Sequence, residues 1–501
     1  MRSLLTDLLL QRLANQHDGA LNKRLYDCIR LAILDGAIAA GERLPSSRDL
    51  AQQLSLSRNT VLTAYEQLLA EGYIEARKGS GTFVTEQLPD GNMQPVDSAN
   101  AGEIREPKHE LSRRGMHLLG YAGASARQWG AFMPGIPDIA SFPHDLWRRI
   151  QTRLTRRVRP EQLSYSPIGG CPELQLALVD YLRVARSVEC TPEQILITEG
   201  THQAMDLLAK MLCNPGDLAW IEDPCYWGIR NVLTINGLRV APIDVDEQGL
   251  APPETLSPDA APRLICVTPS HQYPLGAVMS LARRQRLLAL AQEHGCWVVE
   301  DDYDSEFRFS GSPIPALQGL QAQSPVIYIG TFSKTLYPGL RVSYMVLPPL
   351  LAQSLKTAHS ELYRGGHWLT QATLAQFIRE GHYAAHIRRM RLLYARRRAL
   401  LTSLIEQHLG ANYVGDNSNA GLHMLLSLPS HIDDVVLSAA ILRRGVMVKP
   451  LSSYYLQPTP QRGLLLGYAS VEEEQMMQAF SAIVACIQTL NQTLNSRDSE
   501  A

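Results

Sequence analysis

The hydrophobic pattern changes part-way along the chain, and this change limits the fold more than any other feature. Beyond about residue 116, short apolar runs such as QILIT, RLICVT, WVVED and PVIYIG alternate with helical segments such as HQAMDLLAKML. Strands buried on both faces have such continuous apolar runs, and their alternation with helices is typical of a largely parallel sheet. We therefore expect residues 116–495 to form an α/β domain.

The first 85 residues follow a different plan. Apolar residues recur at helical spacing from Leu21, and Gly36 is expected to end that helix. Two further helices are expected behind the N-cap serines Ser46 and Ser57, the last of them ending at Gly72. The segment YIEARKGSGTFV then alternates around a Gly-Ser-Gly turn, as a hairpin does. Residues 21–85 therefore predict a winged helix-turn-helix of the α+β class.

The stretch between these two regions has the composition of a linker. Residues 86–115 contain few large apolar side chains and many Pro, Gly, Asp, Asn and Glu residues. The full chain has 501 residues, which is more than one hydrophobic core usually organises. We expect a multidomain protein with an N-terminal extension (residues 1–20), a winged helix (21–85), a linker (86–115) and the large domain (116–495).

Composition and charge exclude several classes of protein. With 45% hydrophobic and 19% charged residues, the chain is neither disordered nor fibrous. Its formal charge of -2 provides no general attraction for nucleic acid, so a DNA-binding surface must be local. The 8 cysteines form no CxxC pair, and no apolar run is long enough for a membrane span. We expect a cytoplasmic protein with reduced thiols and no metal site.

Lys334 is the first candidate for chemistry. It follows the apolar strand PVIYIG in the turn GTFSK. A lysine at the end of a buried strand is usually only a solvated cation, but a lowered pKa would make it a nucleophile that forms a Schiff base with an aldehyde. The nearby Ser333 and Arg341 suit the oxygens of a phosphate group. Together these residues indicate pyridoxal 5′-phosphate as a cofactor.

An acidic segment at the end of another strand fits the same cofactor. In WVVEDDYDSEF, Asp301 and Tyr303 point the same way because side chains alternate along a strand. A carboxylate there can hold a pyridine nitrogen protonated, and the phenol can reach the ring oxygen. Asp302 or Asp304 could be the partner instead, and a solvated acidic strand end is the ordinary alternative. The spacing is not that of a calcium-binding loop.

Two more segments could line this pocket. ITEGTHQAMDLL is expected to run from strand to turn to helix, which places Gly200 and Thr201 at a helix N-terminus, a position that favours phosphate. In IEDPCYWG, Tyr226 follows a proline at a strand end and could stack on the cofactor ring. The ordinary interpretations of these two segments are a simple capped helix and an aromatic residue of the core.

Together these motifs carry a resemblance that covers nearly the whole chain. LSYSPIGGCPEL, ITEGTHQA, EDPCYWG, TPSHQYPLGAVMS, EDDYDSEF and TFSKTLYPGLR resemble, in this order, the fold-type-I domain of aminotransferases. GERLPSSRDLAQQLSLSRNTVLTAYEQLLAEGYIEARKGSGTFV resembles a GntR-type winged helix. The chain is thus similar to the MocR/GabR subfamily of bacterial transcription regulators, and in particular to its PdxR-like members.

The resemblance implies roles for individual residues. Lys334 would form the Schiff base with pyridoxal phosphate, Asp301 would pair with the ring nitrogen, Tyr303 would bond the ring oxygen and Tyr226 would stack on the ring. The residues implied to hold the phosphate are Gly200, Thr201, Ser333 and Arg341, with Tyr165 reaching in from a partner subunit. The family also implies a head-to-tail, domain-swapped homodimer.

The chain departs from true aminotransferases at the substrate clamp. The late strand that carries their carboxylate-binding arginine reads LLLGYA here, with Leu465 in the matching position. Arg462 is close in sequence and is a lesser candidate for replacing that arginine. In HQYPLG, Tyr273 stands where transaminases usually keep an asparagine, so neither Tyr273 nor His271 is assigned a role.

The second helix of a helix-turn-helix places its N-terminal residues in the major groove. Winged helices also serve as protein-contact modules, and residues 21–84 carry 8 basic against 7 acidic side chains, so charge alone favours neither use. The GntR likeness favours double-stranded DNA. The residues expected to contact it are Arg48, Ser57, Arg58, Asn59, Thr60, Lys78 and Gly81, with Thr82 beside the wing tip.

The function expected from these observations is that of a transcription regulator rather than an enzyme. It would sense pyridoxal phosphate or an amine effector and would control vitamin B6 or amino-acid metabolism. The alternative is an active aminotransferase with an accessory DNA-binding domain. A third possibility is an adaptor whose cofactor cleft stays empty.

Overall fold

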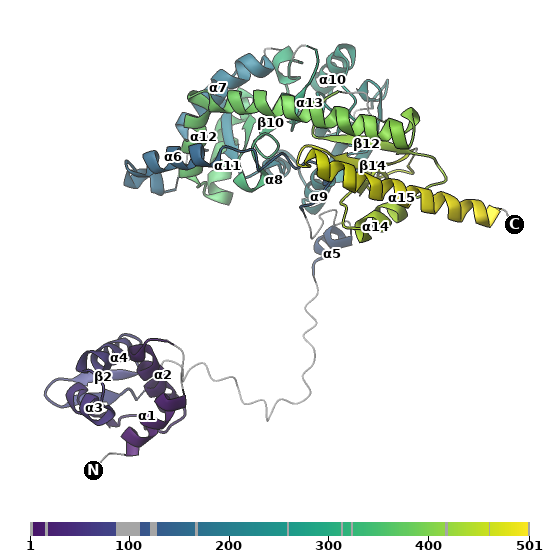
Figure 1. Ribbon diagram of the computed structural model, residues 1–501. Coiled ribbons are helices and arrows are strands. Elements are labelled where there is room, and N and C mark those ends of the chain that lie inside the picture. The colour runs from purple at the N-terminus through teal and green to yellow at the C-terminus, as the bar shows by residue number, and fades with distance from the viewer. Residues whose placement is uncertain are drawn as a thin grey trace. The chain divides into compact units, whose positions relative to one another are not determined.

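The computed structural model describes residues 4–15, 19–86, 111–120, 128–165, 169–257, 260–311, 314–321, 324–415, 419–459 and 461–498. The chain divides into two compact units, Met1–His109 and Glu110–Ala501, which are described separately (Figure 1). Residues 87–110, most of the expected linker, lie outside the described residues, as do residues 1–3 and 16–18 of the expected N-terminal extension.

The first unit is a winged helix, as the sequence predicts. Ser46 caps its second expected helix by accepting a hydrogen bond from the Asp49 N–H (3.2 Å), and Ser57 caps the third by accepting from the Thr60 N–H (3.1 Å). Its three strands pair antiparallel in the order β1-β3-β2. The elements are α1 (Leu4–Asn15), α2 (Leu21–Leu34), β1 (Arg43–Leu44), α3 (Ser47–Leu54), α4 (Arg58–Ala70), β2 (Ile74–Arg77) and β3 (Gly81–Val84).

Two of these elements were not expected from the sequence. Helix α1 buries Leu9 and Leu13 in the same core as Leu25 and Val61, so the N-terminal extension contributes to the first unit. Strand β1 has only two residues and no apolar alternation of its own, and it is held by pairing with β3. Sequence periodicity cannot reveal a strand this short.

An eight-stranded sheet forms the centre of the second unit, in the order β4-β11-β10-β9-β8-β5-β6-β7. The five strands from β10 to β6 run parallel, and β11 and β7 run antiparallel to their neighbours. This is the expected α/β fold. The strands are β4 (Ile195–Thr198), β5 (Leu218–Asp223), β6 (Arg239–Asp246), β7 (Gly249–Leu250), β8 (Leu264–Val267), β9 (Trp297–Asp302), β10 (Val326–Thr331) and β11 (Ser343–Val346).

Helices cover both faces of this sheet (Figure 1). Alternate residues of β10 point to opposite faces. Ile327 and Ile329 pack in a core with α8, α9 and α11. On the other face, Val326 packs with α10, and Tyr328 packs in the core that includes α7, α12 and α13. These helices are α7 (Pro172–Arg186), α8 (Thr201–Leu212), α9 (Trp227–Ile235), α10 (Leu281–His294), α11 (Pro349–Tyr363), α12 (Trp368–Arg379) and α13 (His382–His408).

A smaller antiparallel sheet, in the order β12-β14-β13, follows along the chain. It comprises β12 (His423–Leu428), β13 (Lys449–Pro450) and β14 (Arg462–Gly467), and the remaining helices of the unit are α5 (Arg113–Gly120), α6 (His144–Thr155), α14 (Asp434–Arg443) and α15 (Glu473–Asp498). Short 3-10 turns lie at Pro160–Leu163, Pro192–Gln194, Ser305–Phe307, Gln318–Leu320, Pro338–Leu340, Ala411–Tyr413 and Leu451–Tyr454. Within the described ranges, none of the helices has the length and apolarity needed to cross a membrane.

Candidate functional site

The carboxyl ends of β9 and β10 bring two distant motifs together. The strands are parallel neighbours, with Asp301 opposite Ile329 and Asp302 opposite Gly330. β10 ends at Thr331, three residues before Lys334. In an open α/β sheet, ligands bind at the carboxyl ends of the strands. The acidic motif and the lysine motif therefore meet where such a fold places a site.

Lys334 lies at this edge of the sheet, and its amine points into the protein. Its Nζ donates a hydrogen bond to the carbonyl oxygen of Gly135 at 2.9 Å. Burial lowers the pKa of Lys334, and the carboxylates of Asp304 and Asp301 partly oppose that change. A lowered pKa increases the share of neutral amine, which is the nucleophilic form. Gly135 belongs to the loop MPGIPD, whose contribution the sequence did not reveal.

Asp301 is buried, with 7% of its surface exposed, and it interacts electrostatically with Lys334. Burial, reinforced by the charge of Asp302, raises the pKa of Asp301 to about 7, and Lys334 opposes this. Among the described residues, nothing donates a hydrogen bond to its Oδ1. A buried carboxylate oxygen without a donor is costly, so this oxygen fits a ligand that brings an N–H.

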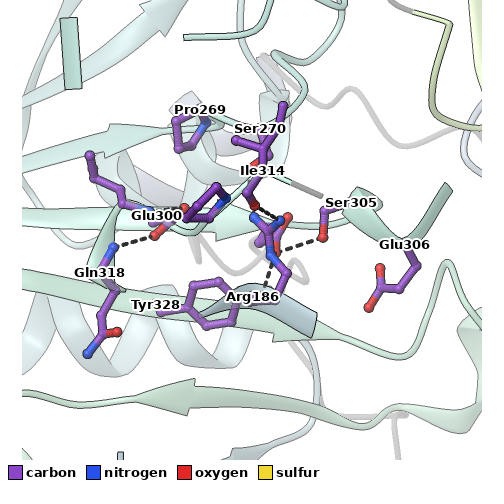
Figure 2. A network of polar contacts seen from close by, with 12 residues as sticks. Arg186, Pro269, Ser270, Glu300, Ser305, Glu306, Ile314, Gln318 and Tyr328 are labelled. Atoms are coloured by element: carbon purple, nitrogen blue, oxygen red, sulfur yellow. Dashed lines mark hydrogen bonds and ion pairs between the residues drawn. The ribbon is translucent and has the colours of Figure 1, made fainter. Parts of the chain in front are cut away.

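Asp302 has the opposite orientation. Its Oδ2 forms an ion pair with Arg186 Nε at 2.7 Å and accepts hydrogen bonds from Tyr328 Oη (2.5 Å) and Ser305 Oγ (2.9 Å). Figure 2 shows Arg186, Ser305 and Tyr328 converging in this network. All of these contacts lie on the face of the sheet away from Asp301. Of the alternatives left open by the sequence, Asp302 is therefore engaged elsewhere.

Tyr303 and Asp304 meet at a buried histidine. His271 Nδ1 lies 2.9 Å from Tyr303 Oη and 3.0 Å from Asp304 Oδ2. His271 and Asp304 are 3% and 2% exposed, so the two groups satisfy one another away from water. Asp304 is thus also engaged, and His271, which had no assigned role, holds the phenol of Tyr303. Only the tertiary structure joins residues from these two loops.

Gly200 and Arg341 form one wall of the site. Gly200 has φ +114 at the N-cap of α8, and a Cβ there would overlap the Arg341 guanidinium. Arg341 Nη2 donates to the Glu199 carbonyl oxygen at 2.5 Å, and Thr201 opens the helix. Ser333 is half-buried beside Lys334, and its N–H donates to Thr331 Oγ1 at 3.2 Å. A helix N-terminus with an arginine beside it attracts a phosphate group.

Aromatic rings complete the site. Tyr226 lies at the N-cap of α9, and its ring stacks on that of His202 with centroids 5.7 Å apart. Its edge meets Tyr273 (6.0 Å between centroids), which in turn meets Tyr303 (5.6 Å). Tyr165, by contrast, is 75% exposed, with the Arg364 guanidinium 5.9 Å above its ring. Within one chain, Tyr165 does not join the other expected residues.

The position of the absent arginine is closed by apolar side chains. Leu465 has no exposed surface and packs with Leu425, Leu451 and Tyr454. The hydroxyls of Tyr454 and Tyr273 lie 3.2 Å apart at this cluster. Arg462 lies on the other face of β14, three residues from Leu465, and pairs with buried Asp434 at 3.2 Å. This ion pair with Asp434 engages the guanidinium of Arg462, the lesser candidate for replacing the clamp.

A pocket of about 490 Å³ opens beside Arg341. Thr198, Glu199 and Arg341 link it to the wall formed by Gly200, and His359 and Tyr363 come from α11. Within the part of the chain that the structure describes, no group of three His, Cys, Asp or Glu side chains could hold a metal ion. Arg341 and the N-terminus of α8 beside this pocket suit an anionic group.

The first unit presents the residues expected to contact DNA. Arg48, Ser57, Arg58, Asn59 and Lys78 are exposed, Thr60 is half-buried, and Gly81 has φ +117 at the start of the wing strand β3. Ser57 and Thr60 also bond each other through their hydroxyls (2.8 Å), so both serve the helix cap. Arg43 on β1 packs its guanidinium against Gly81, and the sequence did not suggest this cation beside the wing.

Comparisons with known families agree with the two units. The family "Bacterial regulatory proteins, gntR family" matches residues 21–84, and "Aminotransferase class I and II" matches residues 145–483. The chain is 41% identical to the probable rhizopine catabolism regulatory protein MocR of Rhizobium meliloti, over 93% of each chain. It is 31% identical to the pyridoxine biosynthesis transcriptional regulator PdxR of Corynebacterium glutamicum, over 92% of this chain and 94% of that one.

Solved structures match the second unit. The α-aminoadipate aminotransferase LysN of Thermus thermophilus, solved with N-(5'-phosphopyridoxyl)-L-leucine, gives a TM-score of 0.66 at 26% identity, over 76% of this chain and 100% of that one. The kynurenine aminotransferase of Pyrococcus horikoshii gives a TM-score of 0.67 at 24% identity, over 79% and 98% of the two chains. The aminotransferase fold is therefore present in full.

Proposed function

Because this chain belongs to the MocR/GabR-type regulators, which join a GntR-family module to an aminotransferase-like domain, we propose that it is a transcription regulator that binds pyridoxal 5′-phosphate at Lys334 and changes its DNA binding in response. The observation that carries the proposal is a buried amine in electrostatic reach of a buried carboxylate whose Oδ1 has no donor among the described residues. These two groups are what an aldehyde and a pyridine nitrogen require.

The residues present fit this cofactor. Lys334 would supply the amine, and Asp301 would accept a hydrogen bond from the ring nitrogen. Tyr303, held by His271, would donate to the ring oxygen, and Tyr226 would cover the ring. Gly200, Thr201, Ser333 and Arg341 would bind the phosphate, and the absence of a Cβ at Gly200 gives Arg341 its place there. When bound, pyridoxal phosphate supplies an aldehyde for amines and a ring that accepts electrons.

The presence of Leu465 in place of a carboxylate-binding arginine favours sensing over catalysis. Leu465 offers no charge to a substrate carboxylate, and Arg462 is bound to Asp434. An amino-acid substrate would therefore lack the ion pair that orients it for proton transfer. The cofactor itself is then the simplest signal, and an amine without a carboxylate is the next. The likeness to a regulator named for pyridoxine biosynthesis supports control of vitamin B6 genes.

A homodimer is also part of the proposal. Tyr165 is exposed and lies apart from the expected set in a single chain. A head-to-tail, domain-swapped pair would let Tyr165 of each chain reach the phosphate of the other. Double-stranded DNA would be bound through the exposed residues at the start of α4 and in the wing, Arg58 and Lys78 among them.

The coupling between the two units gives the first expected outcome. The affinity of the protein for its operator should differ between apoprotein and cofactor-loaded protein, typically 5- to 150-fold for a coupled pair of sites (roughly 1–3 kcal/mol). Fluorescence anisotropy of a labelled operator duplex, titrated with both forms at one salt concentration, measures this difference. A random duplex serves as the control. Equal affinities for both forms would rule out cofactor sensing.

An active aminotransferase remains the second candidate, because Lys334, Asp301 and Tyr303 keep the arrangement that amine transfer needs. Incubating the loaded protein with a panel of amino acids and measuring keto-acid release should show no sustained turnover. Matched amines that lack the carboxylate test whether the site responds to simple amines, since these do not need a carboxylate-binding arginine. Repeated turnover with any amino acid would establish an enzyme. A colourless protein that cannot be labelled at Lys334 would support the third possibility, an adaptor whose cofactor cleft stays empty.

A further inference from the structure

A buried polar network lies on the face of β9 opposite Asp301, and the role proposed for it rests on the proposed cofactor site. Residues of β9 alternate between the two faces of the sheet, so Val299 and Asp301 share one face while Glu300 and Asp302 share the other. Glu300 is fully buried and accepts hydrogen bonds from the N–H groups of Leu317 (2.9 Å) and Gln318 (3.0 Å). Glu300 and Asp302, which flank Asp301 in the sequence, therefore lie on the far face of the sheet, and Figure 2 shows Glu300 in this network.

Arg186 is the cation that compensates Asp302. It is the last residue of α7, is 5% exposed, and holds Asp302 Oδ2 at 2.7 Å. It also donates to Ser270 Oγ at 2.7 Å and to the Ile314 carbonyl oxygen. Ser270 precedes His271, the residue that contacts Tyr303. One guanidinium thus joins the loop before His271 to the end of β9.

Electrostatics connect this network to the cleft. The charge of Asp302 raises the pKa of its neighbour Asp301, second only to burial. Burial lowers the pKa of Arg186, but Asp302, Tyr328 and Glu300 together raise it more, so Arg186 stays charged. Lys334 lowers the pKa of Asp301, whereas Asp304 and Glu222 raise it. The guanidinium of Arg186, which is in contact with Asp302, should weaken the effect of Asp302 on Asp301, because opposite charges in contact act on a third group partly as a dipole.

We propose that Arg186 is a positioning residue for the cofactor: it holds Asp302 on the far face of the sheet and thereby keeps Asp301 turned to Lys334 and ionised for the pyridine nitrogen. Arg186 touches neither the cleft nor Lys334 and acts through Asp302. Its contacts to Ser270 and Ile314 fix the two loops between which the acidic segment runs.

Arg186→Met and Asp302→Asn test the proposal because they should act in opposite directions. Loss of the guanidinium leaves the Asp302 charge uncompensated, so Asp301 should ionise at higher pH. Loss of the Asp302 charge should let Asp301 ionise at lower pH. The probe is pyridoxamine 5′-phosphate, which has the ring nitrogen but no aldehyde and so does not depend on the titration of Lys334. Its Kd is measured by fluorescence quenching of full-length apoprotein across pH, on both sides of about 7.

We expect the midpoint of the acid limb of binding to rise by about one pH unit in Arg186→Met and to fall in Asp302→Asn, one unit being tenfold in affinity. The double variant Arg186→Met/Asp302→Leu removes both charges and should bring the midpoint back toward wild type, even if its unfolding temperature is lower. Shifts of the same sign in both single variants, or no shift in either, would overturn the proposal.

Arg284→Met is the matched control for a purely structural effect. Arg284 is also a buried arginine, at 3% exposed, and it interacts electrostatically with Glu300 and Asp302, but its hydrogen bonds go to the carbonyl oxygens of Met279 (3.0 Å), Pro269 (2.8 Å) and Pro315 (2.9 Å). Its loss should lower thermal stability while leaving the midpoint within about 0.3 unit of wild type. If the wild type does not bind the probe at any pH, the proposed function fails; if it binds and the variants do not differ, only the role of Arg186 fails.

Discussion

Replacing Lys334 with alanine is expected to abolish covalent capture of pyridoxal phosphate. Lys334 carries a buried amine with a lowered pKa, and its Nζ is held 2.9 Å from the Gly135 carbonyl oxygen at the end of β10. Alanine leaves the phosphate wall and Asp301 in place, so weaker, non-covalent binding should remain. The measurement is borohydride reduction of the loaded protein followed by mass spectrometry of its peptides, which should show the added mass on Lys334 and none in the variant.

Lys356→Ala is the control for this experiment. Lys356 also has a pKa lowered by burial, a shift that Glu193 opposes, and it donates to a backbone carbonyl, that of Pro192 at 3.3 Å. This variant should be labelled at Lys334 as fully as the wild type. Labelling at other lysines with Lys334 unmodified would show that the amine is not the attachment point, and the sensing proposal would then lose its basis.

Replacing Arg58 with alanine should have the largest effect on DNA binding. Arg58 is the first residue of α4, the second helix of the helix-turn-helix, and it is exposed. An arginine there can bond a guanine edge with two hydrogen bonds, and losing such a contact costs about 1–3 kcal/mol, or roughly 5- to 150-fold in affinity for the operator. Fluorescence anisotropy with operator and random duplexes should show the loss on the operator and a smaller loss on random DNA.

Two companion variants separate base contacts from phosphate contacts. Gln67→Ala lies on the same helix, nine residues further along and exposed, and should leave DNA affinity unchanged. Lys78→Ala in the wing should weaken binding to all sequences and reduce the salt slope by about one. An Arg58→Ala protein that binds its operator like the wild type would show that this helix face does not read DNA, as expected of a protein-contact module.

Local sequence signals were sufficient to predict the elements that depend only on neighbouring residues. The caps at Ser46 and Ser57 and the hairpin around Gly79 are set by residues within a few positions of one another, and all are present in the structure. The buried strands around Lys334 and Asp301 could likewise be predicted from their apolar runs. Short elements without a period of their own, such as β1, could not, because pairing with β3 alone forms them.

The amino-acid sequence by itself determined the two-unit plan, the α/β class of the second unit and the lysine, acid and glycine motifs that carry the candidate site. It could not choose among Asp301, Asp302 and Asp304, because all three lie within four residues of one another. The tertiary structure distinguishes them by supplying partners from distant segments: Arg186 from α7 for Asp302, and His271 for Asp304. Buried charges need partners, and which partners arrive depends on packing between elements that no local pattern records.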